Sequence, residues 1–384
     1  MYFSQERHAR IQDQIFELIR SGSTTMFEDN FEYPLSIYAD AEVAELERSK
    51  IFRAKPMMAA HSSQIAEVGS YAALNLNSSS VILTRQEDGS VQALLNKCSH
   101  RGAQLVEPGS SGVRKAFACP YHGWAYGSDG VNRRISFDDT FGQSPCSDFD
   151  LVRLPVEERH GFIWVMEDPN TNINVAEHLG EMDSALAEYN LDSWHFYKEH
   201  VFDFPQNWKI MMDGLMDSYH VQFLHGKTIA PYFINNCKAV EHLGDHTLGA
   251  MPRKTFMNYL DKDVSGVDLS KDIIISNLFT PNTMMVMHPH HIEYWTIYQH
   301  PDGPGRSLTH LRYLSPKKEH DERGHKIMEK NWKIAVDAII NEDVPVGNSV
   351  QASASGSTTG KAILGKNEYL NQVFHRTYKK LMEA

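Results

Sequence analysis

Two short segments of the sequence each combine one cysteine, one histidine and one glycine. The segment CSHRG supplies Cys98 and His100, and the segment CPYHGW supplies Cys119 and His122. Thiolate sulfur and imidazole nitrogen are donors that proteins use for transition metals such as zinc and iron. The four side chains therefore predict a metal site built from two loops.

The distribution of these donors favours one kind of site. A structural Cys2His2 zinc site usually takes its cysteines from one element and its histidines from another, whereas here each loop contributes one of each. That alternation fits a 2Fe-2S cluster in which one iron is bound by both cysteines and the other by both histidines, the Rieske arrangement. Gly102 and Gly123 would let the backbone pass close to the cluster. We predict the Rieske cluster, with structural zinc as the alternative.

A later segment, DGLMDSYHVQFLHG at residues 213–226, could hold the metal that receives electrons from this cluster. His220 and His225 are its candidate imidazole ligands. Five steps along an ideal helix leave the two rings about 140° apart, so the helix must end, bulge or bend between them. Two histidines and one carboxylate on one face suit a mononuclear iron(II) with positions open for O2 and substrate. The alternative is a pair of solvent-facing residues on an amphipathic helix.

Together these motifs resemble those of the Rieske non-haem iron oxygenases, specifically their catalytic α subunits of the aromatic-ring-hydroxylating type. The family's Asp-x-x-His-x-x-x-x-His pattern is matched position for position at Asp217, His220 and His225. The segment NEDVPVGNSVQ, residues 341–351, resembles the one that supplies the third iron ligand. The resemblance implies Asp343 as that ligand, with Glu342 as its competitor.

The resemblance also implies a catalytic role for Asp217, which would bind no metal. In the family this carboxylate hydrogen-bonds a metal-bound histidine and, across a subunit boundary, a histidine of the neighbouring chain's cluster. Carried over, Asp217 would link His220 to His122 of the next subunit, which implies a closed homotrimer, with or without a separate β subunit. Asp213 stands where the family often has asparagine.

The activity implied by the resemblance is that of an oxygenase component. It would take electrons from a ferredoxin or reductase, and so indirectly from NAD(P)H, and use O2 to hydroxylate a small, aromatic substrate once or twice. The alternative within the family is oxidation of a quaternary amine or oxidative demethylation. We rank it second because amine oxygenases often carry glutamate where this chain has Asp217.

Two alternatives belong to other classes of protein. A Rieske electron carrier without chemistry of its own would need only the cysteine- and histidine-containing β domain. Residues 166–384 and the His220/His225 pair count against it. A zinc-stabilised binding protein is the other alternative, and its colourless metal would distinguish it from a reddish-brown Rieske protein.

Composition limits the partners and the compartment. The chain of 384 residues is 41% hydrophobic and 22% charged, as expected of a soluble globular protein. Its formal net charge of −12 argues against nucleic acid as a partner. No apolar run approaches the ~18 residues needed to span a membrane, the N-terminal segment is charged throughout, and four cysteines do not make a secreted disulfide framework. These features predict a cytoplasmic protein without a membrane partner.

The sequence pattern predicts an α+β fold. Short alternating runs with hairpin signals at Asp88-Gly89 and Asp129-Gly130 indicate a small all-β domain. The residues that follow mix helical spacing with strand-like runs, which indicates a larger domain with an antiparallel sheet covered by helices. We expect an N-terminal helical segment that packs on the catalytic domain, a Rieske domain inserted after it, and the catalytic domain itself, at residues 1–47, 48–165 and 166–384.

The segment MHPHH, residues 287–291, is a further cluster of histidines. Because it lies between strand-like runs, we interpret it as part of a sheet or loop near the substrate pocket rather than as a third metal site. The methionines and aromatic residues around it could line an apolar pocket or belong to the core.

Overall fold

The computed structural model describes residues 3–142, 146–264, 266–356 and 359–384. It divides into two compact units. The small unit comprises Arg48–His178 and Leu191–Ser193, and the large unit comprises Met1–Glu47, Leu179–Asn190 and Trp194–Ala384. The division at residues 47 and 48 coincides with the expected boundary, whereas residues 166–178 group with the small unit.

The small unit is built from short antiparallel strands. Its described residues form a five-stranded sheet of order β10-β5-β4-β3-β6 and two three-stranded sheets, β11-β12-β2 and β7-β8-β9. The strands are β2 (Met57–His61), β3 (Ser70–Asn75), β4 (Ser80–Arg85), β5 (Val91–Leu95), β6 (Ser111–Val113), β7 (Ala116–Ala118), β8 (Ala125–Gly127), β9 (Asn132–Arg134), β10 (Arg153–Leu154), β11 (Val156–Arg159) and β12 (Phe162–Val165). The helical pieces are the π-helical turn η2 (Arg48–Phe52), the short turns η3 (Ser62–Ile65), η4 (Asp138–Phe141), η5 (Cys146–Phe149) and η6 (Leu191–Ser193), and α3 (Val175–Leu179).

Both hairpin signals of the sequence correspond to hairpins. Gly89 lies between the paired strands β4 and β5 with φ of +85°, and Asp88 Oδ1 accepts a hydrogen bond from the Ser90 amide at 2.9 Å. Gly130 lies between β8 and β9 with φ of +81°. Positive φ is accessible to glycine at little cost, so these two glycines set the turns that bring the flanking strands together.

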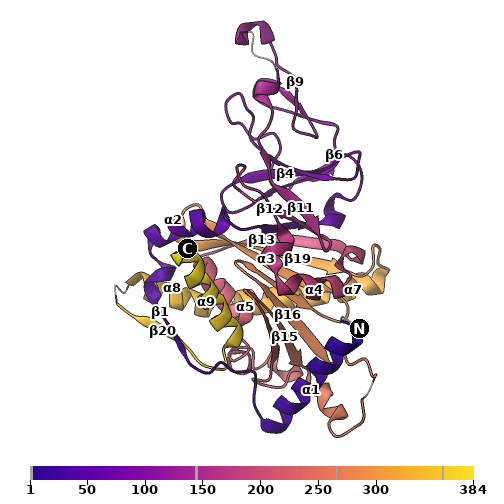
Figure 1. Cartoon of the computed structure of the whole chain (residues 1–384), viewed down its shortest axis with the longest axis vertical. Helices are drawn as coiled ribbons and strands as arrows, with labels where there is room; N and C mark the ends of the chain where they lie inside the picture. The colour runs from indigo at the N-terminus through magenta and orange to yellow at the C-terminus, as the bar shows by residue number, and fades with distance from the viewer. Residues whose placement is uncertain (1–2, 143–145, 265, 357–358) are drawn as a thin grey trace. The chain divides into compact units, whose positions relative to one another are not determined.

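The large unit is organised around a seven-stranded antiparallel sheet of order β13-β19-β18-β17-β16-β15-β14 (Figure 1). Its strands are β13 (His195–Phe204), β14 (Ala239–Leu243), β15 (His246–Pro252), β16 (Ile273–Phe279), β17 (Thr283–Met287), β18 (Ile292–His300) and β19 (Gly303–Ser315). The interior strands β15 and β16 are buried along their whole length, as expected of a sheet covered on both faces.

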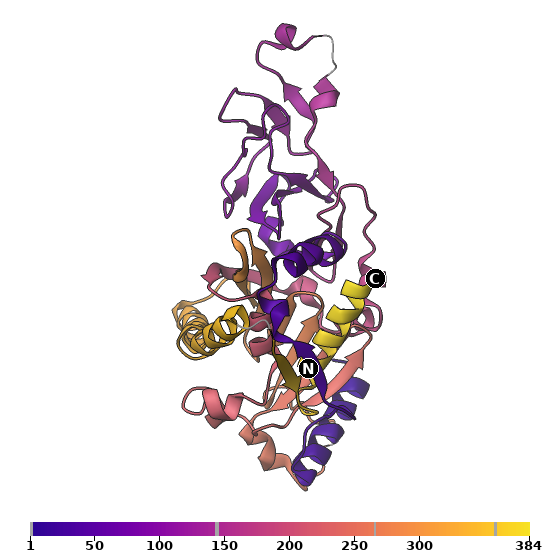
Figure 2. The ribbon, with the colours of Figure 1, turned by 90° about the vertical axis from the view of Figure 1, so that its left-hand side faces the viewer.

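Helices cover this sheet. Helix α5 (Trp208–Met216) packs on β17, β18 and β19, and helix α9 (Tyr369–Glu383) packs on β15 and meets α5, so both lie on one face (Figure 1). Helix α1 (Gln5–Ser21) contacts β14 and β15 (Figure 2). The remaining helical elements are α4 (Glu181–Glu188), α6 (Val221–Leu224), η7 (Ala230–Tyr232), η8 (Lys254–Tyr259), α7 (Glu322–Ala338), η9 (Ile339–Asp343) and α8 (Val344–Gly356). The α+β fold predicted from the sequence is confirmed.

The N-terminal segment is not wholly helical, which corrects the expectation for residues 1–47. Strand β1 (Phe31–Pro34) pairs antiparallel with β20 (Lys361–Leu364), and only then do η1 (Leu35–Tyr38) and α2 (Ala41–Glu47) follow. The alternating burial of β1 fits a strand with one covered face. The partner strand lies near the other end of the chain, so local sequence alone gave little indication of this pairing.

A buried carboxylate joins the N-terminal segment to α5. Glu47 is fully buried and forms an ion pair with Lys209, which is also fully buried. Glu47 also accepts hydrogen bonds from Trp208 Nε1 at 2.8 Å, Gln299 Nε2 at 2.8 Å and the Tyr378 hydroxyl at 2.6 Å. Both oxygens therefore have partners, as a buried charge requires. This cluster anchors the start of α5, the helix that leads into the histidine segment.

None of the helices in the described part of the chain is both long enough and apolar enough to cross a membrane.

Candidate metal centres and substrate cavity

The two cysteine- and histidine-containing loops of the small unit share one backbone design. In the first, the Cys98 amide donates to the Ala103 carbonyl at 2.8 Å and the Gly102 amide donates to the Cys98 carbonyl at 2.8 Å. In the second, the Cys119 amide donates to the Trp124 carbonyl at 2.7 Å, and the Gly123 amide donates to the Cys119 carbonyl at 3.0 Å. Each loop closes on itself within six residues.

Glycine is required at the same place in both loops. Gly102 has φ of +81° and Gly123 has φ of +73°, a backbone conformation that costs other residues about 1–2 kcal/mol. A Cβ atom at Gly123 would lie 3.3 Å from Ser136 Oγ. The glycines noted in the sequence therefore set the loop shape.

The four side chains of these loops converge. The Nδ1 atoms of His100 and His122 lie 3.1 Å apart, which is close enough for both to bind one iron. Cys98 and Cys119 are buried, whereas both histidines are partly exposed. The Tyr126 hydroxyl lies 3.2 Å from Cys98 Sγ, where it can donate to a thiolate. The donor set fits a Rieske cluster, with its sulfur-bound end covered and its histidine-bound end towards the surface.

Aromatic rings hold both imidazoles. Trp124, which is buried, stacks on His100 with 4.8 Å between centroids and 11° between planes. Tyr121, which is exposed, stacks on His122 at 3.8 Å and 28°, and the Arg101 guanidinium lies 5.1 Å from the Tyr121 ring. Because Trp124 is buried, it covers the His100 ring from solvent on that side.

In the large unit, the main break in the helical chain lies before His220, whereas helical spacing had predicted an irregularity between His220 and His225. Helix α5 ends at Met216, and Asp217 follows in an extended conformation (φ −74°, ψ 125°). His220 and His225 then flank the single turn α6 as its two end residues. Asp213 therefore lies within α5, whereas Asp217 and His220 lie beyond its end.

The break brings three donor atoms together. His220 Nε2 and His225 Nε2 lie 3.1 Å apart, and Asp343 Oδ1 lies 3.4 Å from the first and 3.3 Å from the second. Three neighbouring ligands of an octahedral ion, each ~2.2 Å from it, lie about 3.1 Å from one another. The triangle fits a mononuclear iron with one face open, and we call it the donor triangle.

On the side that faces away from the donor triangle, each imidazole contacts a different carboxylate. Asp217 Oδ2 lies 3.0 Å from His220 Nδ1, and Glu342 Oε2 lies 2.5 Å from His225 Nδ1. The structure thus separates the two competing acids of the sequence, since Asp343 completes the triangle and Glu342 contacts the opposite nitrogen of His225. The sequence could not separate them, because adjacent acids in one helical turn look equivalent.

These charges shift the ionisation of the donors. Burial alone would lower the pKa of His220, but hydrogen bonds to Asp217 and Asp343 raise that pKa to about 9. Burial likewise lowers the pKa of His225, and the hydrogen bonds and charges of Asp343 and Glu342 outweigh it and raise the pKa. Burial opposes the change at Asp343, yet the two histidines lower its pKa. A surplus of negative charge surrounds the imidazoles, as a cation site needs.

A buried lysine secures the break before Asp217. Lys238 is 7% exposed, and its Nζ donates at 3.2 Å to the carbonyl of Met216, the last residue of α5. A cation at a helix C-terminus satisfies a free carbonyl and complements the helix dipole. Burial lowers the pKa of Lys238 to about 8, while the charge of Asp217 opposes that shift. Nothing in the sequence around Lys238 pointed to this role.

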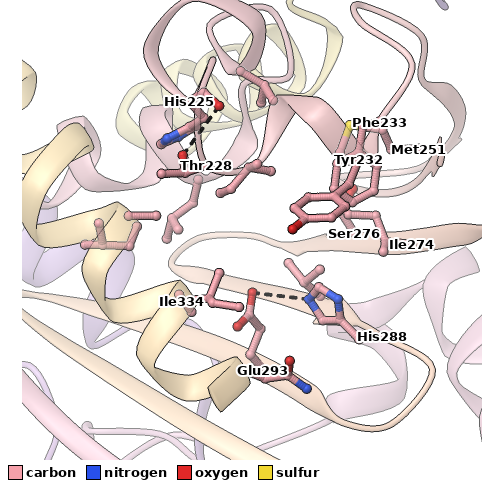
Figure 3. Close-up of a pocket in the computed structure, with 18 of the residues that line it drawn as sticks. His225, Thr228, Tyr232, Phe233, Met251, Ile274, Ser276, His288, Glu293 and Ile334 are labelled. Atoms are coloured by element: carbon pink, nitrogen blue, oxygen red, sulfur yellow. Dashed lines mark hydrogen bonds and ion pairs between the residues drawn. The ribbon is translucent and has the colours of Figure 1, made fainter. Parts of the chain in front are cut away.

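A cavity of about 510 Å³ includes the donor triangle in its wall. This volume is within the usual range for small-molecule sites. Figure 3 shows Tyr232, Phe233, Met251 and Ile274 along the wall, with Ile334 on another side. The apolar pocket suggested by the methionines and aromatic residues therefore has a counterpart, although most of the segment 283–287 is core.

The histidine segment 287–291 lies at this cavity, in the turn between β17 and β18. His288 and Glu293 lie across the cavity from His225, with 3.5 Å between His288 Nε2 and Glu293 Oε1 (Figure 3). The rings of His288 and His291 stack at 4.4 Å and 8°, and donor atoms of His288, His291 and Glu293 lie within 4.8 Å of one another. The interpretation of this segment as a loop near the pocket agrees with the structure.

A second polar cluster near the triangle involves Asp213. Its carboxylate accepts a hydrogen bond from the Tyr38 hydroxyl at 2.6 Å and lies 2.8 Å from His375 Nε2. Asp213 lines a second cavity of about 390 Å³, which also reaches Asp217 and Asp343. Asp213 thus ties helix α9 and the N-terminal segment to α5.

Comparison with known families agrees with both halves of this description. Residues 55–141 match the family described as "Rieske [2Fe-2S] domain", and residues 191–384 match "Ring hydroxylating alpha subunit (catalytic domain)". The second match covers half of the chain. The chain therefore belongs to the ring-hydroxylating α-subunit family, which confirms the resemblance seen in the sequence.

Relatives in sequence include dioxygenases and a carnitine monooxygenase. The 2-halobenzoate 1,2-dioxygenase large subunit of Burkholderia cepacia is 30% identical over 212 residues, which are 52% of this chain and 45% of that protein. The carnitine monooxygenase oxygenase subunit of Acinetobacter baumannii is 28% identical over 197 residues, 49% of this chain and 51% of that protein. The chain thus spans about half the length of the curated relatives it matches.

Solved structures share the fold over most of the chain. The quaternary ammonium Rieske monooxygenase CntA in complex with L-carnitine aligns with a TM-score of 0.77 at 20% identity, covering 91% of this chain and 95% of that one. Naphthalene 1,2-dioxygenase from Rhodococcus sp. aligns with a TM-score of 0.75 at 19% identity, covering 99% and 98%. At these identities the likeness concerns the fold alone.

Family membership implies two cofactors, and the side chains suit both. A Rieske 2Fe-2S cluster belongs with the first domain and a mononuclear iron with the second. The residues predicted to bind them are those whose donor atoms converge in the two units. Their assignment as ligands, and the role of Asp217 between subunits, remain predictions from the sequence that this geometry favours.

Proposed function

We propose that the chain is the terminal oxygenase component of an enzyme system that uses O2 and externally supplied electrons to hydroxylate a small, aromatic substrate. The observation that carries this proposal is a mostly apolar cavity of about 510 Å³ whose wall contains His220, His225 and Asp343. A donor triangle with one open face inside such a cavity suits a reaction in which O2 and an apolar substrate meet.

The two units have different roles in the proposed reaction. When bound, the cluster supplies electrons one at a time and the iron supplies the means to activate O2. The chain's own residues hold the surrounding groups, because Asp217 fixes the His220 ring and the apolar wall keeps water from the substrate. A separate ferredoxin or reductase, drawing on NAD(P)H, would deliver the electrons.

Electron transfer between subunits is part of this proposal. Asp217 has one observed imidazole neighbour, His220, and the proposal adds His122 of a neighbouring copy of the chain as the second. The partial exposure of His100 and His122 supports a cluster that passes electrons through its histidine-bound end. This arrangement requires a closed ring, for which we propose a homotrimer, with or without a β subunit. The cytoplasmic location also remains a prediction from the sequence.

One observation favours a second candidate function. Glu293, a carboxylate, lines the cavity, as does Trp295, and a quaternary ammonium ion is attracted by carboxylates and aromatic faces. Two of the relatives described above carry names that refer to carnitine or quaternary ammonium. Oxidation of a quaternary amine is therefore the alternative to ring hydroxylation.

A single experiment distinguishes these functions. The purified protein, with iron and cluster present, is supplied with a surrogate reductase, NADH and 18O2 against a panel of halobenzoates, polycyclic aromatics and quaternary amines. We expect labelled phenol or cis-dihydrodiol from an aromatic compound. Labelled product from an amine alone would replace the main proposal by the alternative, and electron consumption with peroxide but no labelled product from any compound would contradict both.

A further inference from the structure

Glu342 and Asp343 are neighbours in sequence that meet opposite nitrogens of the same ring. Asp343 Oδ1 lies 3.3 Å from His225 Nε2, whereas Glu342 Oε2 lies 2.5 Å from His225 Nδ1. We propose that Glu342 is a positioning residue for the metal, which acts by holding the His225 ring rather than by binding the ion. The proposal rests on the donor triangle of the proposed function and adds to it the residue that orients one of its members.

The hydrogen-bonding capacity of Glu342 determines the state of His225. An ionised carboxylate can only accept hydrogen bonds, so His225 must carry its proton on Nδ1. The lone pair of Nε2 then points at the donor triangle, which is the state a metal requires. Without Glu342 the neutral ring could place its proton on Nε2, and a metal would have to displace that proton.

Glu342 is itself held in place. The Thr228 hydroxyl donates to Glu342 Oε2 at 2.8 Å, from the segment that follows α6. Thr228 lines the cavity beside His225 (Figure 3). The same carboxylate oxygen therefore joins the chain just after His225 to the chain just before Asp343, and it fixes the distance between two donors that are far apart in sequence.

A local irregularity of the helix allows Glu342 and Asp343 to contact the same imidazole ring. Residues Ile339–Asp343 form a π-helical turn between α7 and α8. Such turns are rare in proteins, but those that occur are often found at functional sites. A π-helical turn spaces successive side chains at a smaller angle than the 100° of an α-helix, which lets Glu342 and Asp343 reach the two ends of one imidazole.

The arrangement also sets the charge of the site. Asp217 faces Nδ1 of His220 just as Glu342 faces Nδ1 of His225, so two carboxylates lie behind the two imidazoles and a third joins the triangle. Three carboxylates against one divalent ion leave a formal charge of −1. A carboxylate behind an imidazole makes the ring a stronger donor, so Glu342 should raise the affinity for a divalent metal.

The test compares metal binding among variants of the full-length protein. Fe(II) affinity is measured by competition with a chromophoric chelator, and the visible spectrum of bound Co(II) reports the geometry of the site. We expect Glu342→Ala to weaken Fe(II) binding by about 10–100-fold and to alter the Co(II) spectrum. Glu342→Gln keeps an acceptor for the Nδ1 proton, so it should retain affinity within about tenfold of the wild type.

Two further variants complete the design. Thr228→Val removes the hydrogen bond to Glu342, together with a longer one of 3.4 Å to the His225 carbonyl, and should weaken Fe(II) binding by a few fold. Asp337→Asn removes a carboxylate from the exposed face of α7, where it pairs with Lys333, and should bind Fe(II) like the wild type. Circular dichroism and the cluster's absorption check that each variant is folded.

The outcomes separate this inference from the proposed function. Wild-type Fe(II) affinity and an unchanged Co(II) spectrum in Glu342→Ala would overturn the positioning role while leaving the donor triangle in place. Failure of the wild-type protein itself to bind Fe(II) or Co(II) at the triangle would instead contradict the proposed function. Weaker binding in Glu342→Ala, with recovery in Glu342→Gln, supports the proposal.

Discussion

The two predicted metal sites of this chain are built in opposite ways. His100 and His122 are 22 positions apart, and each belongs to a loop that closes through its own backbone hydrogen bonds. His225 and Glu342 are 117 positions apart, and they meet only because two helical segments pack together in the large unit. The first site depends on local turns, and the second depends on the tertiary structure of a whole unit.

This difference teaches where each site is vulnerable. A change in the small unit should affect its cluster through the loop that carries the change. A change anywhere in the framework of the large unit can displace the donor triangle, even from a distance. Variants of each unit can therefore test this contrast.

Loss of a donor from the triangle should abolish iron binding there and leave the cluster in the small unit intact. Asp343→Ala removes one corner of the triangle, so we expect Fe(II) affinity to fall by more than about 100-fold, beyond the effect of an outer carboxylate, and product formation to stop. The cluster's visible absorption should remain, because its loops are local. Iron content and absorption are measured on one sample. A parallel loss of the cluster would show that the sites are not independent.

Removal of the buried charge at Glu47 should destabilise the large unit. Glu47→Gln leaves Lys209 buried without its counterion, which typically costs about 3–5 kcal/mol. Urea unfolding followed by circular dichroism measures the free energy, and Fe(II) binding should weaken as α5 loosens. The matched control Glu42→Gln, exposed on the same helix, should stay within about 0.5 kcal/mol. Equal effects of the two changes would contradict the prediction.

Acid should weaken the sheet behind the donor triangle. Burial tends to raise the pKa of Glu199, but Arg312 and His310 outweigh it and lower the pKa to about 2, against an ordinary value of 4.5. A carboxyl with a lower pKa in the folded state stabilises the fold above its unfolded pKa. That contribution, at most about 3 kcal/mol, is lost as the pH falls from 4.5 towards 2.

The unfolding free energy between pH 5.5 and pH 2.5 checks this expectation. Glu199→Gln should reduce the slope of stability against pH in this range. An unchanged slope would assign the acid sensitivity to other carboxylates.

A change at Asp217 should slow electron transfer between the two metal sites without removing the metal from either one. Asp217→Asn keeps a hydrogen-bond acceptor for His220 but loses the charge, so both metals should remain while product formation slows by about 10–100-fold. Single-turnover experiments with a pre-reduced cluster measure electron transfer directly. Normal turnover would rule out a bridging role for this residue.

The smallest effect is expected in a cluster loop. Gly123→Ala places a Cβ at φ of +73° and should cost about 1–2 kcal/mol, with faster bleaching of the cluster in air. Gly109→Ala carries a similar φ of +84° where a Cβ has open space, so it controls for backbone strain away from the cluster. Bleaching at the same rate in both variants would mean that the loop shape does not protect the cluster.

The sequence predicted the local features of this protein well. The hairpins at Gly89 and Gly130, and the cysteine and histidine pairs of the two loops, depend on neighbouring residues whose types determine the backbone. Helical geometry also predicted an irregularity near His220 and His225, although the structure places the main break at Asp217, before both histidines. For these features, short-range chemistry was sufficient.

The features that could not be predicted depend on distant contacts. Asp343 and Glu342 are equivalent in sequence, and only the packing of their π-helical turn against His225 gives them different partners. Strand β1 (Phe31–Pro34) was missed because its partner β20 lies near the other end of the chain. Lys238 gained its role from the carbonyl of Met216, which no local pattern reveals.

The π-helical turn at Ile339–Asp343 has a consequence for comparing this chain with its homologues. Deleting one residue there would return the backbone to regular α-helical spacing and change the directions in which the two acidic side chains point. A homologue one residue shorter at this point could retain every histidine and carboxylate in its alignment and still be unable to hold iron. Counting residues through this turn is therefore a sharper criterion for a working oxygenase than checking which amino acids are present.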